Sequence, residues 1–221
     1  MNFKDRFYII LLGIFIASLV TCNLIANKFV TVNLGFKVFI VSAGILPYPL
    51  TFLVTDLISE IYGQKKANLA VFSGFVASIF VLSFLWLGAQ FNSIPNSIVD
   101  DSTYNAVFQN AWRLISASMI AYLFAQFVDV RIFHFWKKLT NGKHLWLRNN
   151  GSTIASQLID TTLVISILFV GVWDTDQILS AIIDGWIFKM LMALLDTPII
   201  YVVIYLLKGK IDIAPYQIKK D

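Results

Sequence analysis

The sequence is dominated by apolar runs that are long enough to cross a lipid bilayer. A helix needs about 20 residues to span roughly 30 Å of hydrocarbon. Six runs meet this length: residues 7–26, 38–62, 68–89, 112–136, 152–173 and 178–207. Of the 221 residues 58% are hydrophobic and 14% are charged, whereas soluble domains carry about 25% charge. We therefore predict an all-α polytopic membrane protein with six transmembrane helices, forming one domain over residues 1–221.

Basic residues between the runs predict the orientation, because cytoplasmic connections of membrane proteins carry an excess of Lys and Arg. They occur at the N-terminus, in the second and fourth connections and at the C-terminus, as Lys4, Arg6, Lys65, Lys66, Lys137, Lys138, Lys143, Arg148, Lys208, Lys210, Lys219 and Lys220. The alternate connections hold Lys28, Lys37, Asp100, Asp101, Asp174 and Asp176. Both termini are therefore predicted to be cytoplasmic.

Several other classes of protein are disfavoured. The single cysteine, Cys22, allows no internal disulfide, and two histidines cannot build a zinc site. Thr21 precedes Cys22 where a lipoprotein signal has a smaller residue, and five further runs follow. The basic residues form short clusters instead of a nucleic-acid-binding stripe, and no phosphate-binding Gly-x-x-x-x-Gly-Lys-Ser/Thr loop is present. We expect no metal, no cofactor and no nucleic-acid partner.

Ionisable side chains inside the apolar runs are the most informative functional feature. Each costs about 2.5 to 3.5 kcal/mol at the bilayer centre on insertion scales. We therefore expect them to face one another or a water-filled cavity. They are Asp56, Glu60, Asp129, Arg131, Asp160, Lys189 and Asp196.

Helical spacing groups these residues on shared faces. The pairs are Asp56 with Glu60, Gln126 with Asp129, Gln157 with Asp160, and Lys189 with Asp196. One chamber lined by four helices is the functional interpretation, and Asn23 and Asn27 can add donors to it. The alternatives are that Glu60 pairs with Lys65 or Lys66 at the interface, and that Arg131 extends to the membrane surface.

Helix breakers and small residues add local expectations. Gly44, Pro47 and Pro49 interrupt the second run and Pro198 the sixth. Discontinuous helices are a recurring feature of transporters, although a packing kink is the alternative. Small residues four apart, Gly13 with Ala17 and Gly74 with Ser78, predict close helix packing.

The sequences Gln126-Phe127-Val128-Asp129 and Gln157-Leu158-Ile159-Asp160 echo each other. A 3+3 pseudo-repeat and chance both account for the echo.

Three motifs carry a resemblance to a known family. Residues 49–63, PLTFLVTDLISEIYG, resemble the signature of the bacterial queuosine precursor transporters, also called the vitamin uptake transporter family. The likeness continues in the fifth and sixth runs, at Arg148, Ser152, Ser156, Gln157, Asp160, Thr161, Lys189, Asp196, Thr197 and Pro198. It covers residues 23–201. Val164 departs from it, because many relatives have an aromatic residue there.

The resemblance implies import of a small 7-deazaguanine base across the bacterial inner membrane. The cargo would be 7-cyano- or 7-aminomethyl-7-deazaguanine, or queuine, used to make the tRNA nucleoside queuosine. A carboxylate of Asp56, Glu60 or Asp160 can accept two parallel N–H groups of such a base. Gln126 and Gln157 can bind its other polar atoms. Tyr48, Phe52 or Trp186 can stack on its ring.

Two other functions stay open. The chain can be the substrate-binding subunit of an energy-coupling-factor transporter, which needs a separate energising complex. It can also be an intramembrane lipid-modifying enzyme whose Asp residues hold magnesium, although only Asp56 and Glu60 have the spacing of such sites. We predict a carrier and not an enzyme. The preferred precursor, the coupling ion and a homodimer are left open.

Overall fold

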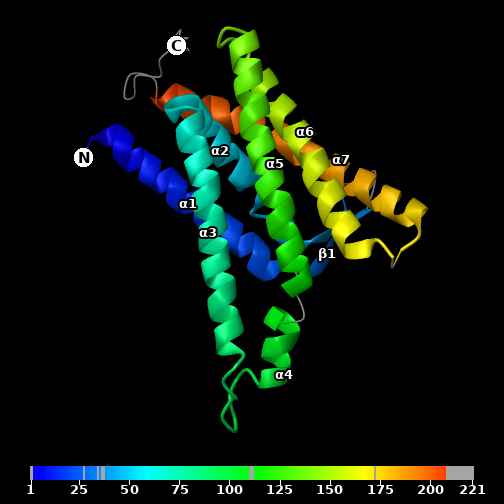
Figure 1. The fold of residues 1–221 in the computed structure, drawn as a ribbon. Coiled ribbons are helices and arrows are strands. Elements are labelled where there is room, and N and C mark those ends of the chain that lie inside the picture. Colours follow the sequence, from blue (N-terminus) through cyan, green and yellow to red (C-terminus); the bar gives the residue numbers. More distant parts are fainter. Residues whose placement is uncertain are drawn as a thin grey trace.

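The computed structural model describes residues 2–26, 28–33, 35, 38–109, 112–171 and 173–207. In this part of the chain there are seven α-helices and one short β-hairpin, which lies beside α7 (Figure 1). The helices are α1 (Phe3–Ile25), α2 (Tyr48–Tyr62), α3 (Gln64–Gly88), α4 (Asp101–Tyr104), α5 (Trp112–Leu139), α6 (Leu145–Phe169) and α7 (Thr175–Leu207). The strands are β1 (Phe29–Asn33) and β2 (Val38–Ser42), and two short helical segments are η1 (Ala43–Ile45) and η2 (Asn105–Gln109).

The prediction of one helix over residues 38–62 is wrong at its start. Residues 38–42 form β2, which pairs antiparallel with β1 so that Phe29 lies opposite Ser42. Both segments are rich in β-branched and aromatic residues, which favour strands. Gly35 in the connection has φ +84°, a conformation that suits glycine. The chain is thus helical with one hairpin.

The prolines of the second run set the start of α2. Pro47 caps this helix, and Pro49 lies in its first turn, where no donor to a preceding carbonyl is needed. Pro198 behaves differently, because α7 continues through it from Thr175 to Leu207. The predicted interruption of the sixth run is therefore wrong. Packed neighbours and membrane surroundings allow proline inside such helices.

Within the described residues, four helical segments are long and apolar enough to cross a membrane. They are Phe3–Ile25, Ala43–Tyr62, Gln64–Gly88 and Thr175–Leu207. α5 and α6 are also long, but α5 carries Asp129, Arg131 and two terminal lysines, and α6 carries Arg148 and Asp160. The protein is a helical membrane protein, and a crossing by α5 and α6 stays a prediction.

α2 occupies the centre of the helical assembly. Its residues 51–59 are all buried, and its apolar side chains share a core with α1, α3 and α5. Phe15, Ile58 and Phe133 are among the fully buried members of that core. Polar groups on α2 therefore face other helices and not lipid.

Close packing occurs at only one of the two small-residue pairs. A Cβ added to Gly74 would lie 2.7 Å from Phe15 Cε1 and 2.9 Å from Leu19 Cδ2, so α3 approaches α1 closely there. Ser78, one turn on, is buried as well. Gly13 and Ala17 are exposed on α1, and a Cβ on Gly13 would meet no described atom within 4 Å. The prediction of close helix packing at Gly13 and Ala17 is therefore wrong.

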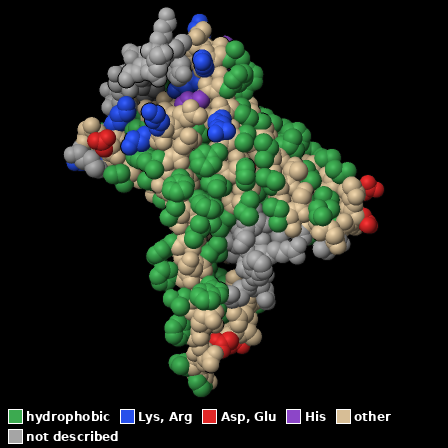
Figure 2. Space-filling view, viewed as in Figure 1, with side chains coloured by type: hydrophobic (Ala, Val, Ile, Leu, Met, Phe, Trp, Pro, Cys, Tyr) green, Lys and Arg blue, Asp and Glu red, His purple; other side chains and the backbone are tan. Residues whose placement is uncertain are grey.

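Surface charges separate toward different ends of the molecule. Most visible Lys and Arg side chains gather at the end of the molecule where α1 and α3 begin and α5 ends, together with one acidic group, whereas the other visible acidic side chains lie at the far ends, near α4 and the start of α7 (Figures 1 and 2). Between them the visible surface is mostly apolar. An apolar band between two polar ends is the surface that a bilayer requires.

Candidate functional site

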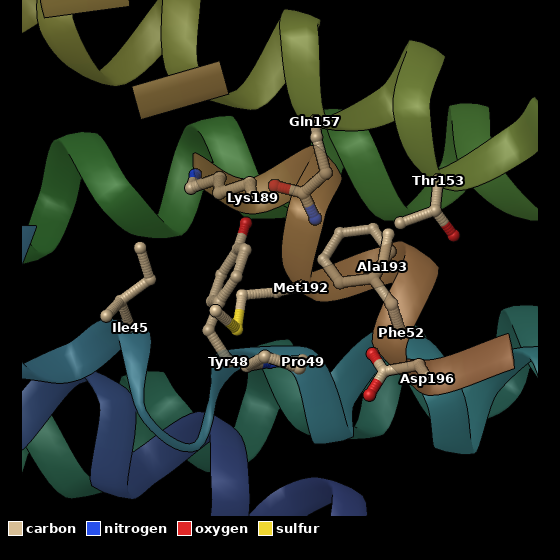
Figure 3. A pocket seen from close by; sticks show the side chains of 10 residues that line it. All are labelled: Ile45, Tyr48, Pro49, Phe52, Thr153, Gln157, Lys189, Met192, Ala193 and Asp196. Carbon is tan, nitrogen blue, oxygen red and sulfur yellow. The ribbon is translucent and has the colours of Figure 1, made fainter. Parts of the chain in front are cut away.

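A narrow cleft lies between the beginning of α2 and the facing sides of α6 and α7 (Figure 3). Its empty volume is about 260 Å³, including space open to the surroundings. Its lining residues are Ile45, Tyr48, Pro49, Phe52, Thr153, Gln157, Lys189, Met192, Ala193 and Asp196. Three of the predicted polar site residues, Gln157, Lys189 and Asp196, are therefore in its wall, together with the stacking candidates Tyr48 and Phe52.

Helix geometry explains why these residues line one space. Lys189, Met192, Ala193 and Asp196 recur at the spacing of a single face of α7. On the outer side of the cleft, the hairpin packs Phe39 against Phe188 of α7, with ring centroids 5.3 Å apart. Ile45 and Met192 belong to the same apolar cluster. The hairpin therefore supports two of the side chains that form the cleft wall.

A buried ion pair dominates the chemistry of the cleft. Lys189 Nζ lies 2.5 Å from Asp160 Oδ2, and the two side chains are 15% and 4% exposed. The ammonium also lies 4.5 Å from the centre of the Tyr48 ring, which adds a cation–π attraction. In Figure 3 the Tyr48 hydroxyl points toward Lys189 and Gln157. The cleft thus has a cationic wall with a carboxylate directly behind it.

Asp56 and Asp129 form a second polar group behind the cleft. Their carboxyl groups interact across the α2–α5 contact. Ser156 Oγ donates to Asp129 Oδ1 at 3.0 Å, and Thr55 Oγ1 donates to Gln126 Oε1 at 3.2 Å. None of these residues is among those that line the cleft.

Glu60 belongs to a third group, an ion cluster that joins α2 to the ends of α5 and α6. Lys137 Nζ lies 2.9 Å from Glu60 Oε2, and Arg148 Nη2 lies 2.8 Å from Glu60 Oε1. Arg148 also donates to the carbonyl oxygens of Gly142 and Lys143. Glu60 thus pairs with these two cations and not with Lys65 or Lys66, which are exposed, so the alternative interpretation named the wrong partners.

The remaining candidates lie apart from the cleft or outside the described residues. Asn23 is buried on α1 but does not line the cleft. Asn27 lies outside the described residues. Arg131 is exposed on α5, and its extension to the membrane surface stays a prediction. Trp186 donates to the carbonyl of Ile154 at 3.0 Å and is not part of the lining.

The ionisable residues thus meet in three neighbouring groups and not in the single chamber that was predicted. Several polar atoms beside them are buried and have no hydrogen-bond partner among the described residues. These include Tyr48 Oη, Gln157 Oε1, Gln126 Nε2 and both carboxylate oxygens of Asp56. Buried polar atoms are satisfied in most native structures by protein groups or ordered water, so these atoms mark positions where water, a polar ligand or a proton can bind. No group of three or more potential metal ligands occurs in the described part of the chain.

Sequence reasoning missed part of the cleft wall. Thr153 lies one turn before Gln157 on α6, and this four-residue spacing could have identified it. Met192 and Ala193 could have been found from the shared face of Lys189 and Asp196. Lys137 was assigned only to the topology signal, yet its side chain is 6% exposed. No sequence pattern indicated that it would turn inward to Glu60.

The fold and the site define a helical membrane protein with a charged cleft between its helices, an arrangement typical of carriers for small polar molecules. The family comparison agrees, because a family model described as a vitamin uptake transporter matches residues 42–203. The chain belongs to this family. The matched region includes the cleft, the acid pair and the ion cluster.

Individual relatives are more distant. A Bacillus subtilis (strain 168) protein named "Probable queuosine precursor transporter" is 30% identical over 159 residues, covering 72% of this chain and 69% of its own. The Escherichia coli (strain K12) "Queuosine precursor transporter" is 24% identical over 174 residues, covering 77% and 71%. No solved structure matches the chain.

Proposed function

We propose that this protein imports a queuosine precursor across the bacterial inner membrane. The relatives named above are called queuosine precursor transporters, and the family consists of transporters. The observation that carries the proposal is the buried Lys189–Asp160 pair in the wall of a cleft between α2, α6 and α7. In this proposal the chain is one domain over residues 1–221 that moves its cargo without changing it chemically.

The cleft suits a guanine-like base. Asp160 can accept the parallel N–H groups of such a base, because carboxylates form charge-assisted hydrogen bonds with paired donors. Lys189 can donate to the ring carbonyl once it separates from Asp160. Tyr48 and Phe52, with ring centroids 5.4 Å apart, offer flat apolar surfaces. Gln157 Oε1, which has no partner among the described residues, can accept one further donor.

The cleft is narrow, which suits a closed state of the carrier. Tyr48 and Met192 project into it (Figure 3), so a planar base has to displace them. Opening on one side at a time is the behaviour expected of a carrier that alternates access around a fixed site. The hairpin on one side and the Glu60 cluster on the other are the elements that would have to move.

The charge distribution supports the proposed orientation. The end of the molecule that carries most Lys and Arg would face the cytoplasm, and the Asp-rich connections would face outward. With six crossings, both termini would be cytoplasmic. α5 and α6 then cross the membrane with Asp129, Arg148 and Asp160 turned inward, since all three are buried, and with the exposed Arg131 extending to the membrane surface.

The test uses a bacterial host that cannot make the base and that has no transporter of its own. Each precursor is supplied at low concentration, and queuosine in tRNA is measured with the gene present or absent. Replacing Asp160→Asn should lower uptake about tenfold or more, because a hydrogen bond to a charged group contributes about 1.5 to 3 kcal/mol. Asp176→Asn, an exposed acid at the start of α7, is the matched control and should keep wild-type uptake.

The same experiment tests the need for an energising partner. Repeating it in a host without energy-coupling-factor components should leave uptake unchanged if the chain works alone. Equal queuosine with the gene present and absent, for every precursor, would refute the proposed function.

A further inference from the structure

Three buried or half-buried acids lack an ion-pair partner among the described residues. Lys189 is paired with Asp160, and Lys137 and Arg148 are both paired with Glu60. Asp56, Asp129 and Asp196 have no such cation. Asp56 is 1% exposed and Asp129 is fully buried. Two unneutralised carboxylates at this depth would carry a large desolvation cost.

Asp56 and Asp129 are also close to each other. Their carboxyl groups interact directly, although neither oxygen of Asp56 has a hydrogen-bond partner by distance and angle in the described residues. Asp129 uses Oδ1 to accept from Ser156, and its Oδ2 has no such partner there. Adjacent carboxylates in a dry environment cannot both be charged, and they bind one proton between them.

The surroundings of the pair contain acids and neutral polar groups. Asp196 on α7 and Glu60 one turn along α2 interact electrostatically with Asp56. Ser152, Thr153 and Ser156 on α6 face Asp129. Gln126, one turn before Asp129, is fully buried, and its Nε2 has no partner among the described residues. Glu60 itself is paired with Lys137 and Arg148.

We propose that the Asp56–Asp129 pair is the proton-binding site that couples import of the base to inward proton flow. This inference rests on the proposed function. One proton forms an O–H bond with a carboxylate of the pair, travels with the cargo and leaves to the cytoplasm when that bond breaks. No other reactant takes part.

Asp196 connects this proton site to the cargo site. It lines the cleft, and its charge acts on Asp56, so the charge of Asp196 at the cleft favours binding of a proton by the pair. In Figure 3 its carboxylate lies at the end of the cleft away from Lys189. The proposed proton site, which is not part of the cleft lining, is therefore separate from the cargo site. A proton is favoured, because two adjacent buried carboxylates without a cation bind one proton between them.

The test uses the purified full-length protein in liposomes with labelled 7-cyano-7-deazaguanine, which carries no charge of its own. An outside that is more acidic by one pH unit should drive about tenfold accumulation for one proton per base, because one pH unit corresponds to about 1.36 kcal/mol. A pH-sensitive dye inside the liposomes should show one proton entering per base. A sodium gradient should have no effect.

Asp56→Asn imitates a permanently protonated side chain. It should abolish accumulation, so that inside and outside concentrations become equal, while labelled base still exchanges for unlabelled base at a measurable rate. Asp129→Asn should behave in the same way and replaces Asp56→Asn if that variant does not fold. Asp176→Asn, the exposed control, should keep both accumulation and exchange.

The possible results separate the inference from the proposed function. If the wild-type protein exchanges the base but ignores the pH gradient, or responds to sodium, the proton inference is overturned and the carrier function stands. Full accumulation by Asp56→Asn and Asp129→Asn overturns the inference as well. If the wild-type protein exchanges none of the three precursors, the proposed function is refuted, and the proton inference that rests on it is refuted with it.

Discussion

Individual acids in this protein are stabilised in different ways, although their sequence contexts look alike. Asp160 forms an ion pair with one lysine, and Glu60 forms ion pairs with a lysine and an arginine. Asp56 instead interacts with a second acid. Helical spacing could predict which residues share a face, as with Gln126 and Asp129. It could not predict partners from other helices, because Glu60 and Arg148 are 88 positions apart in the chain.

The Glu60 cluster provides a stability test at this scale. Glu60→Gln should lower the free energy of unfolding by about 3 to 5 kcal/mol, because Lys137 and Arg148 would stay buried without an acid. Thermal unfolding in detergent micelles measures the effect. Lys138→Gln, an exposed lysine next to Lys137, is the control and should change stability little. Equal stability of both variants would show that the cluster contributes nothing to folding.

At the scale of elements, apolar run length predicted the long helices but not every boundary. The strand β2 was assigned to a helix because Val, Phe and Ile are apolar in either structure, and only pairing with β1 decides between them. α6 begins at Leu145, earlier than predicted, because its first turns are polar yet buried. In soluble proteins a proline usually ends or kinks a helix. Pro198 lies inside α7, and the helix continues through it.

The contact between α1 and α3 gives a prediction for a pair of elements. Gly74→Ala should destabilise the protein by about 1 to 3 kcal/mol, because the new methyl group would overlap Phe15 and Leu19. Gly13→Ala is the matched control, since a Cβ there would have no described atom within 4 Å and alanine favours a helix more than glycine. Thermal unfolding of both variants in detergent compares them. A larger loss for Gly13→Ala would contradict the packing described here.

For the whole molecule, the sequence predicted the class and the family more reliably than the site. Composition and run length sufficed for a membrane protein, and three separated motifs sufficed for the family, which the match over residues 42–203 confirms. The division of the acids into three groups depends on how α2 lies between α1, α3, α5 and α7. Such long-range packing is not encoded in any local pattern.

The proposed orientation can be tested on intact cells. With Cys22→Ser as background, Ser97→Cys before α4 should react with a membrane-impermeant thiol reagent added outside. Lys143→Cys, between α5 and α6, should react only after the membrane is opened. Both positions are exposed, so reactivity reports sidedness and not burial. Labelling of Lys143→Cys in sealed cells would reverse the proposed orientation.

The length of α7 has a consequence for the choice of lipid. Its 33 residues correspond to about 50 Å of helix, compared with roughly 30 Å of hydrocarbon. In Figure 1 it runs obliquely to α3 and α5, and tilting is how a long helix fits a thinner bilayer. Bilayers of longer acyl chains should make α7 more upright and shift Lys189 relative to Asp160 on α6. The rate of transport would then depend on membrane thickness, although the amino-acid sequence is unchanged.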